Sequence, residues 1–197
     1  MKKIYFATHN DHKLQEVQAI LGSDYRVLSA KEGGLEDAPQ ESALTLEGNA
    51  LIKARALYNK VKSPCFADDT GLLVAQLDGA PGVHSARYAG DEATDAQNRA
   101  KLLQNLAPLP EPHLAAFRTV VAYIDAGAEE HLFYGEVQGV ILPREQGSAG
   151  FGYDSLFMPE GETLTFAQMP AHLKNKISHR YRAVQQLLTY LSTHKDD

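Results

Sequence analysis

The chain has 197 residues, enough for one domain with a substantial apolar core or for two lobes that share a core. Its hydrophobic fraction of 44% and charged fraction of 22% are those of a globular protein and exclude a disordered or fibrous chain. The net charge of −6 excludes a sequence-independent duplex binder, so we expect no nucleic-acid partner. A nucleotide substrate stays possible, because a few basic groups in one cleft can hold a triphosphate.

The first part of the chain alternates strands with helices. Branched and aromatic residues over 3–7 predict a buried strand, and cap residues over 8–11 precede apolar residues at helical spacing over 14–21. Gly22 is expected to end this helix. The elements expected next are a strand over 25–30, a polar loop over 31–43, a helix over 46–60, a strand over 65–67, an acidic turn and a strand over 72–77.

The second part supplies a hairpin and the last helices. Glycine-rich loops are expected over 79–90 and 147–154, a helix over 94–105, and a final helix with apolar residues from 183 to 191. Two strands, over 115–124 and 132–142, flank a short turn and predict an antiparallel hairpin. The whole pattern predicts an α/β protein, one domain over 1–197, in which helices flank a mixed central sheet.

The cysteine content and the N-terminus indicate the cellular setting. Cys65 is the only cysteine, so the sequence predicts neither a disulfide nor a Cys-rich zinc site, and its apolar neighbours place it in the core. Behind Lys2 and Lys3 only residues 4–7 are apolar, too short a run for a signal peptide or membrane helix. We therefore expect a cytoplasmic protein with no membrane partner.

The first strand ends at a candidate anion site. A helix N-terminus presents unpaired N–H groups and a positive dipole end, to which Thr8 and Asn10 can add hydrogen bonds and Lys13 a charge. A simple helix cap at Asn10 or Asp11, with Lys13 in solvent, explains the same residues. The chain contains neither a Walker motif nor a GxGxxG fingerprint, which excludes the usual phosphate loops.

Asn49 and Lys53 lie four residues apart and so share one edge of their predicted helix. They can reach into a cleft together. An ordinary exposed polar pair is the other interpretation.

Asp68 and Asp69 directly follow a buried apolar strand. Adjacent carboxylates there repel each other and lose solvation unless a cation is present, and in an extended strand they point to opposite faces. A turn at Gly71 would let one face a cleft while the other fixes the loop. Mg²⁺ takes one or two protein carboxylates together with phosphate oxygens, and Glu41 is the candidate second ligand. The alternative is a surface turn with Asp as a local cap.

Two segments near the C-terminus carry candidate base-binding groups. In the glycine-flanked segment 150–154, the Phe151 ring can stack on a base for about 1–3 kcal/mol, and Asp154 can accept a ring N–H. A tight turn before a strand is the structural alternative. Ser178 suits a helix N-cap, but His179 and Arg180 just inside that helix oppose its dipole, which favours a ligand contact as much as a structural one.

Together these motifs resemble the inosine/xanthosine triphosphate pyrophosphatase family. The likeness runs from end to end of the chain, through residues 7–13, 49–54, 67–72, 79–82, 85–88, 150–154 and 177–180. It implies hydrolysis of non-standard purine nucleoside triphosphates (ITP, dITP and XTP) to the monophosphate and pyrophosphate, which removes them from the nucleotide pool. It also implies a Mg²⁺ cofactor, two lobes with an active-site cleft between them, and a homodimer.

The resemblance also implies residue roles. Asp69 would be the catalytic proton acceptor and would hold the metal with Glu41. The phosphates would be held by Thr8, Asn10, Lys13 and Lys53. Phe151 would stack on the base, which would be read or positioned by Asp154, Lys174, His179 and Arg180. The other positions expected at the substrate are His9, Asp11, His12, Thr70, Gly152 and Tyr153.

Two other functions fit the same residues. One is a non-catalytic nucleotide sensor, although a pure binder gains nothing from carboxylates beside a phosphate unless they hold metal. The other is a pyrophosphatase for ordinary or otherwise modified nucleotides. His84 stands where the family usually has Tyr, which leaves the contacts of the loop over 79–90 open.

Overall fold

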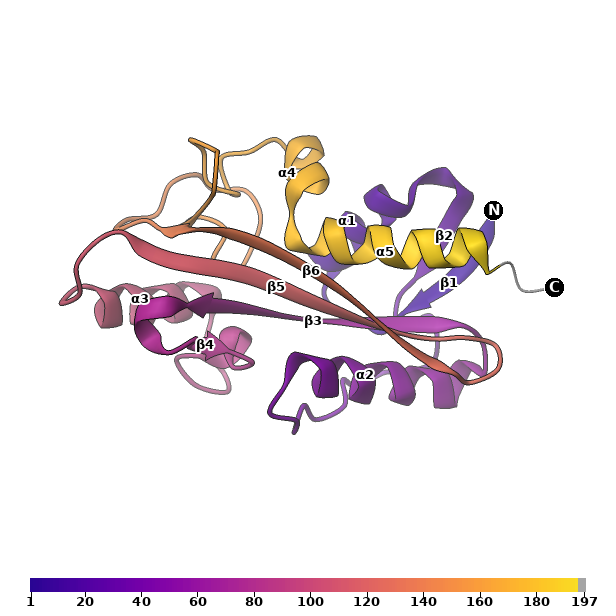
Figure 1. Ribbon diagram of the computed structural model, residues 1–197. Coiled ribbons are helices and arrows are strands. Elements are labelled where there is room, and N and C mark those ends of the chain that lie inside the picture. Colours follow the sequence, from indigo (N-terminus) through magenta and orange to yellow (C-terminus); the bar gives the residue numbers. More distant parts are fainter. Residues whose placement is uncertain (195–197) are drawn as a thin grey trace. The chain divides into compact units, whose positions relative to one another are not determined.

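The computed structural model describes residues 1–194 (Figure 1). One mixed sheet has the strand order β2-β1-β3-β5-β6-β7, with β4 paired to β3. β1 pairs in parallel with β2 and β3, whereas the β3–β4 and β6–β7 pairs are antiparallel. The predicted α/β class with a mixed sheet flanked by helices is confirmed. Within residues 1–194, no helix is both long enough and apolar enough to span a bilayer.

The described elements alternate in the predicted way. The strands are β1 (Lys2–Phe6), β2 (Tyr25–Leu28), β3 (Cys65–Val74), β4 (Pro81–Gly82), β5 (His113–Ile124), β6 (Glu130–Ile141) and β7 (Phe157–Pro159). The α-helices are α1 (Asp11–Leu21), α2 (Leu46–Val61), α3 (Asp95–Leu106), α4 (Ala171–Ile177) and α5 (His179–Thr193). Short 3₁₀ turns lie at Gly22–Asp24, Ala75–Leu77 and Ser85–Arg87.

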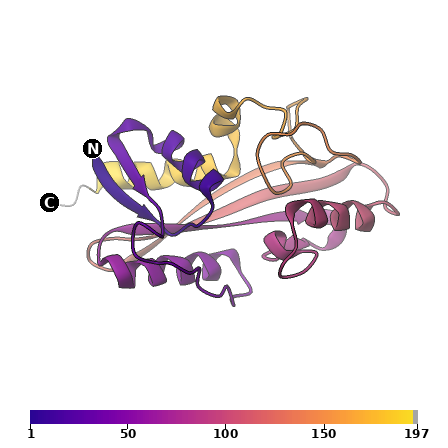
Figure 2. The ribbon, with the colours of Figure 1, turned by 180° about the vertical axis from the view of Figure 1, so that it is seen from behind.

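The chain forms two compact units, and the first comprises residues 1–69, 119–135 and the described residues from His179 onward. Here α1 and α5 cover one face of the sheet and α2 covers the other, as both views show (Figures 1 and 2). Apolar stripes of α1 and α5 pack on β1, β3 and β5, and the Phe6 and Phe66 rings stack with centroids 4.6 Å apart. This packing positions the N-terminal ends of α1 and α5 in unit 1.

The second unit comprises residues 70–118 and 136–178. Its core joins one face of α3 to the sheet and to the segment that follows β6; the largest buried side chains of this core are Phe117, Tyr153, Phe157 and Phe166. Tyr153 and Leu156 anchor the glycine-rich segment over 147–154 in this core. The segment is thereby packed like an element of secondary structure.

β3 runs without interruption from Cys65 to Val74, so the predicted acidic turn after Ala67 and the separate strand over 72–77 are wrong. Residues 75–77 form a 3₁₀ turn instead. The strand continues because cationic side chains of unit 1 pair with both Asp68 and Asp69. A buried carboxylate that has such a partner needs no turn to reach water.

Several local predictions are confirmed. The Asn10 side chain accepts hydrogen bonds from the backbone N–H groups of His12 and Lys13 and so caps α1, which Gly22 ends. Cys65 is fully buried, and burial raises the pKa of its thiol to about 12. The final region differs in one respect: residue 178 separates two helices, and Lys174 lies in α4.

Candidate active site

The period of two along β3 sends the adjacent carboxylates to opposite faces of the sheet in unit 1. Asp68 lies two residues after Phe66 and so points to the same face of the strand, where the Phe66 ring packs in the core beneath α1 and α5. Asp69 lies four residues after Cys65 and so points to the opposite face, toward α2, where the Cys65 thiol donates to the Ala54 carbonyl. The two carboxylates therefore meet different partners, although they are neighbours in sequence.

Asp68 binds one cation with each oxygen. Lys13 Nζ of α1 lies 2.9 Å from Oδ1, and Arg180 Nε of α5 lies 3.0 Å from Oδ2. Arg180 is 1% exposed, and its Nη1 donates to Glu16, three residues after Lys13 on α1. Burial alone would raise the pKa of Asp68, but Lys13, Arg180 and Lys53 hold it well below its usual range. Asp68 is therefore a permanent anion that fixes two cationic side chains.

Asp69 shares one cation with Glu41. Lys53 Nζ of α2 lies 2.7 Å from Asp69 Oδ1 and 2.7 Å from Glu41 Oε1. Burial raises the pKa of Asp69, Glu41 adds to the effect, and Lys53 opposes it without cancelling it. Despite its own burial, Lys53 has a raised pKa because three carboxylates surround it. Asp69 is thus a carboxylate with enhanced affinity for a proton.

The second oxygen of Asp69 lacks a hydrogen-bond partner. No group within residues 1–194 donates to Oδ2, although this atom is buried. A buried carboxylate oxygen without a donor costs free energy unless a cation or water completes its shell. Oδ2 is therefore the oxygen of this cluster that could accept a cation or a water.

Charge in the cluster is unbalanced toward the negative. Three cationic side chains (Lys13, Lys53 and Arg180) face four carboxylates (Glu16, Glu41, Asp68 and Asp69). An anionic phosphate chain would meet repulsion here unless further positive charge entered with it. Glu41, Asp69 and the donor-free Oδ2 are hard oxygen ligands of the kind that Mg²⁺ takes. The residues present therefore fit a magnesium ion.

The loop between β1 and α1 completes the set in unit 1. Thr8 is buried and its Oγ1 accepts the Asn10 N–H at 3.1 Å, which orients the capping residue. His9 Nε2 lies 2.9 Å from the Leu35 carbonyl oxygen. Asp11 and His12 are exposed at the start of α1. The structure thus confirms that Asn10 caps α1 through its side-chain carbonyl oxygen. The anion-binding role of this helix end stays a prediction.

In unit 2 the predicted base-binding residues converge on one carboxylate oxygen. Asp154 Oδ2 accepts the Phe151 N–H at 3.0 Å and Lys174 Nζ at 2.8 Å. Lys174 Nζ also lies 5.2 Å from the centre of the Phe151 ring, a cation–π distance. Gly150 has a φ of +75°, and a Cβ there would overlap Asp154 Oδ2. Only glycine at 150 therefore allows this arrangement.

Other predicted residues have different environments. Tyr153 is buried in the core of unit 2, and its hydroxyl donates to the Ser85 carbonyl at 2.8 Å, so only its backbone can face a ligand. Thr70 is half-buried in β3, and His179 is buried at the start of α5. Asn49 is buried and accepts the Ala43 N–H at 2.9 Å, which fixes the loop that carries Glu41. The interpretation of Asn49 as an exposed polar pair with Lys53 is therefore wrong.

Sequence reasoning missed Glu16. Its carboxylate holds Arg180, and its spacing of three residues from Lys13 on the polar face of α1 was the available signal. That spacing alone predicts an exposed ion pair between Lys13 and Glu16. Only the tertiary fold brings Arg180 of α5 to Glu16.

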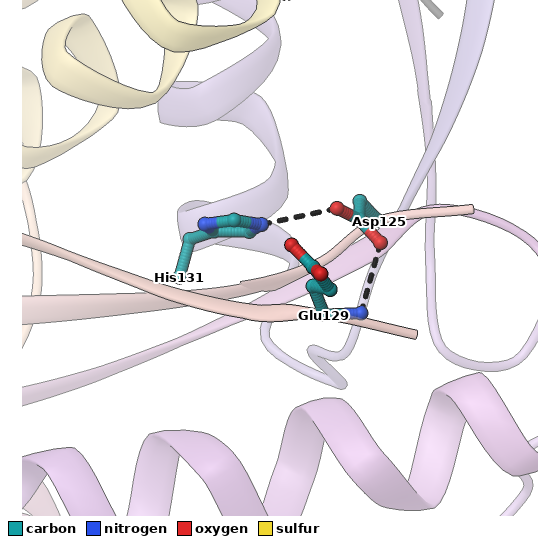
Figure 3. A group of neighbouring side chains, drawn as sticks. All are labelled: Asp125, Glu129 and His131. Atoms are coloured by element: carbon teal, nitrogen blue, oxygen red, sulfur yellow. Dashed lines mark hydrogen bonds and ion pairs between the residues drawn. The ribbon is translucent and has the colours of Figure 1, made fainter. Parts of the chain in front are cut away.

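A second group of metal-ligating side chains lies at the turn between β5 and β6. Within residues 1–194, Asp125, Glu129 and His131 are the one set of three or more such residues with ligand atoms close together (Figure 3). Asp125 accepts the Glu129 N–H at 2.9 Å and lies 3.1 Å from His131 Nε2, which also lies 3.1 Å from the Tyr190 hydroxyl. These contacts stabilise the hairpin turn, so we assign the group a structural role.

Comparison with known proteins places this geometry in a family. The Ham1 family model matches residues 4–190. A dITP/XTP pyrophosphatase of Porphyromonas gingivalis is 49% identical over 191 residues, which cover 97% of this chain and 98% of that protein. A dITP/XTP pyrophosphatase of Geobacter sulfurreducens is 44% identical, with 97% of each chain covered.

Solved structures agree with the sequence comparison. A HAM1 protein from Coxiella burnetii superposes with a TM-score of 0.88 at 35% identity, and the match covers 98% of this chain and all of that one. The Ham1 protein of Staphylococcus aureus gives a TM-score of 0.87 at 34% identity, with 98% and 100% covered. The predicted resemblance is therefore confirmed, and the chain belongs to the Ham1 family.

Proposed function

We propose that the chain hydrolyses ITP, dITP and XTP to the nucleoside monophosphate and pyrophosphate, and so removes these purine nucleotides from the cytoplasmic pool. The observation that carries the proposal is the buried Asp69, whose Oδ1 shares Lys53 with Glu41 and whose Oδ2 has no donor within residues 1–194. A site that only bound a triphosphate would gain nothing from these carboxylates unless they held metal. The names of the relatives contain two of these substrates, dITP and XTP.

The phosphate chain would be held by residues of unit 1. Thr8, Asn10 and the first turn of α1 offer hydrogen-bond donors, and Lys13 and Lys53 supply the charge that stabilises pyrophosphate as it leaves. Glu41 and Asp69 would hold Mg²⁺, which when bound neutralises phosphate charge and orients the triphosphate.

Asp69 would accept the proton of the attacking water. Its Oδ2 has no hydrogen-bond donor within residues 1–194, which leaves this oxygen able to accept a proton. Asp68 is excluded from this role, because two cations hold its charge in place. Asp68 instead positions Lys13.

The base would be bound by unit 2, with the Phe151 ring as stacking platform and Asp154 and Lys174 as polar contacts. We propose that His179 and Arg180 favour a 6-keto oxygen over the adenine amino group. An unmatched buried polar group costs about 1–3 kcal/mol, which is the expected scale of this selectivity.

The test is a substrate panel. The protein is incubated with Mg²⁺ and ITP, XTP, dITP, GTP, ATP or dUTP, and pyrophosphate and orthophosphate are measured separately. We expect pyrophosphate from ITP, XTP and dITP. Orthophosphate as the primary product would refute cleavage between the α- and β-phosphates. Binding without turnover would favour a sensor, and equal rates on all six would favour a general pyrophosphatase.

Asp69→Asn isolates the proposed base. We expect loss of turnover with nucleotide binding and folding largely retained, because the amide keeps the shape of the side chain and removes its proton affinity. Isothermal titration with ITP and a urea unfolding curve check binding and folding. Normal turnover in this variant would remove Asp69 from the reaction.

Assembly is a separate proposal. From the family resemblance we propose a homodimer, which light scattering coupled to size-exclusion chromatography tests by the mass of the particle in solution.

A further inference from the structure

Gly152 is held by α3 through both of its backbone polar groups. Its N–H donates to Asp95 Oδ2 at 2.7 Å, and its carbonyl accepts Arg99 Nη1 at 2.8 Å. Asp95 and Arg99 are four residues apart, so they project from one face of α3. All three residues belong to unit 2. The backbone at Gly152 is therefore fixed by two hydrogen bonds from one helix.

Neither helix side chain is needed for the helix itself. The cap of α3 is supplied by Thr94, in a capping box with Gln97. The carboxylate of Asp95 is therefore directed to Gly152 and away from the helix end. This use of a charged side chain on a loop N–H gives a stronger hydrogen bond than a neutral acceptor would.

Arg99 also connects the segment to its far end. Its Nε lies 3.0 Å from Glu145 Oε2, and this same oxygen accepts the Ser155 hydroxyl at 2.9 Å. The pKa of Glu145 is held below its usual value chiefly by Arg99. One guanidinium thus links Gly152 directly, and Ser155 through Glu145, to α3.

The gripped residue lies between the two groups that would contact a base. Gly152 follows Phe151 and precedes Asp154 by two, and its φ of +60° is one of several conformations that glycine adopts without steric cost. Hydrogen bonds on both sides of Gly152 fix the peptide planes that orient the Phe151 ring and the Asp154 carboxylate. Without them the segment would sample other conformations, and binding would have to order it again.

We propose that Asp95 and Arg99 are positioning residues that hold residues 151–154 in the conformation that binds the purine. The inference rests on the proposed function for its substrate. Neither residue touches the reacting atoms, which are assigned to unit 1. Their removal should therefore weaken binding and leave the rate of the bound complex nearly unchanged.

The two hydrogen bonds from Asp95 and Arg99 to Gly152, called the clamp below, are tested without substrate by amide hydrogen exchange. In Asp95→Ala we expect the Gly152 N–H to exchange at least about tenfold faster, since its acceptor is gone. The Val74 N–H, which donates to the Ala80 carbonyl in the same unit, is the internal control and should be unchanged. Unchanged exchange at Gly152 would overturn the clamp.

The positioning role is tested by kinetics. We expect Asp95→Ala and Arg99→Ala each to raise KM for ITP about tenfold or more with kcat within about twofold, the scale of one charge-assisted hydrogen bond. Arg99→Lys keeps a donor and should recover part of the loss. Arg118→Ala is the matched control, because Arg118 is a half-exposed arginine of unit 2 that pairs with Glu136.

The outcomes separate the clamp from the proposed function. Pyrophosphate release by the unchanged protein tests the function by itself, and only the ratio of variant to unchanged protein tests the clamp. A KM equal to that of the unchanged protein, despite faster exchange at Gly152, would overturn the positioning role. An equal rise in KM for Arg118→Ala would do the same.

Discussion

The pKa of Asp68 is lowered and the pKa of Asp69 is raised, although the two residues are adjacent and both buried. Two cationic side chains bind the two oxygens of Asp68 and keep its pKa low. Asp69 has one cation, which it shares with Glu41, so burial prevails and its pKa is raised. The alternation of side chains along β3 gives Asp68 a structural role and leaves Asp69 for the proposed chemical one.

Stability should separate the two carboxylates. Asp68→Asn leaves Lys13 and Arg180 facing a neutral group, and removal of one partner from a buried ionic cluster costs about 3 kcal/mol. Asp69→Asn removes a carboxylate whose charge is already disfavoured and leaves Lys53 paired with Glu41, so its cost should be much smaller. Urea unfolding of both variants measures the difference. Equal free energies of unfolding would contradict the distinction.

The candidate residues could be named from sequence, but their pairings could not. Asp68 pairs with residues 55 and 112 positions away, and the sequence carries no record of which helix faces which side of β3. The same gap explains the wrong turn after Ala67. The local sequence shows no cationic partner for two carboxylates after a strand, and only the tertiary fold brings the cations to them.

At the scale of elements, the first turn of α5 depends on a glycine in β6. A Cβ at Gly135 would overlap the His179 carbonyl oxygen and lie 2.5 Å from the Ala183 nitrogen. The helix can approach β6 only because that atom is missing. This approach sets the position from which Arg180 reaches Asp68.

Gly135→Ala should therefore displace the start of α5. We expect a loss of about 2–3 kcal/mol in the free energy of unfolding, as for overpacking against backbone, and a lower kcat through Arg180 and Asp68. Gly127→Ala in the β5–β6 turn is the control, because a Cβ there meets only Asp125 Oδ1 at 3.4 Å. Urea unfolding and turnover of ITP provide the measurements. If both alanines cost the same, Gly135 has no special role.

Element prediction succeeded where local signals decide the structure. The cap at Asn10 and the capping box at Thr94 are local, and both helices begin beside them. It missed α4, a helix of seven residues whose N-terminus has no side-chain cap hydrogen bond to mark it. Periodicity reports the buried face of a helix but not the element that covers it.

At the scale of the molecule, the carboxylates proposed for chemistry and the stacking platform proposed for the base belong to different units, whereas His179 and Arg180 lie in the first. Glu41, Lys53 and Asp69 lie in the first unit, and Phe151 and Asp154 lie in the second. Each set is held by contacts inside its own unit. Substitutions in one set should therefore act on one kinetic parameter more than on the other.

Phe151→Ala tests this division. Loss of base stacking removes about 1–3 kcal/mol of binding, so KM for ITP should rise about tenfold or more. The proton acceptor and its partners in the first unit are untouched, so kcat should change by less than about twofold. Steady-state kinetics with ITP, and Phe151→Tyr as a variant that keeps an aromatic face, provide the comparison. An unchanged KM would refute the stacking platform, and a large fall in kcat with constant KM would show that the two units do not divide the work in this way.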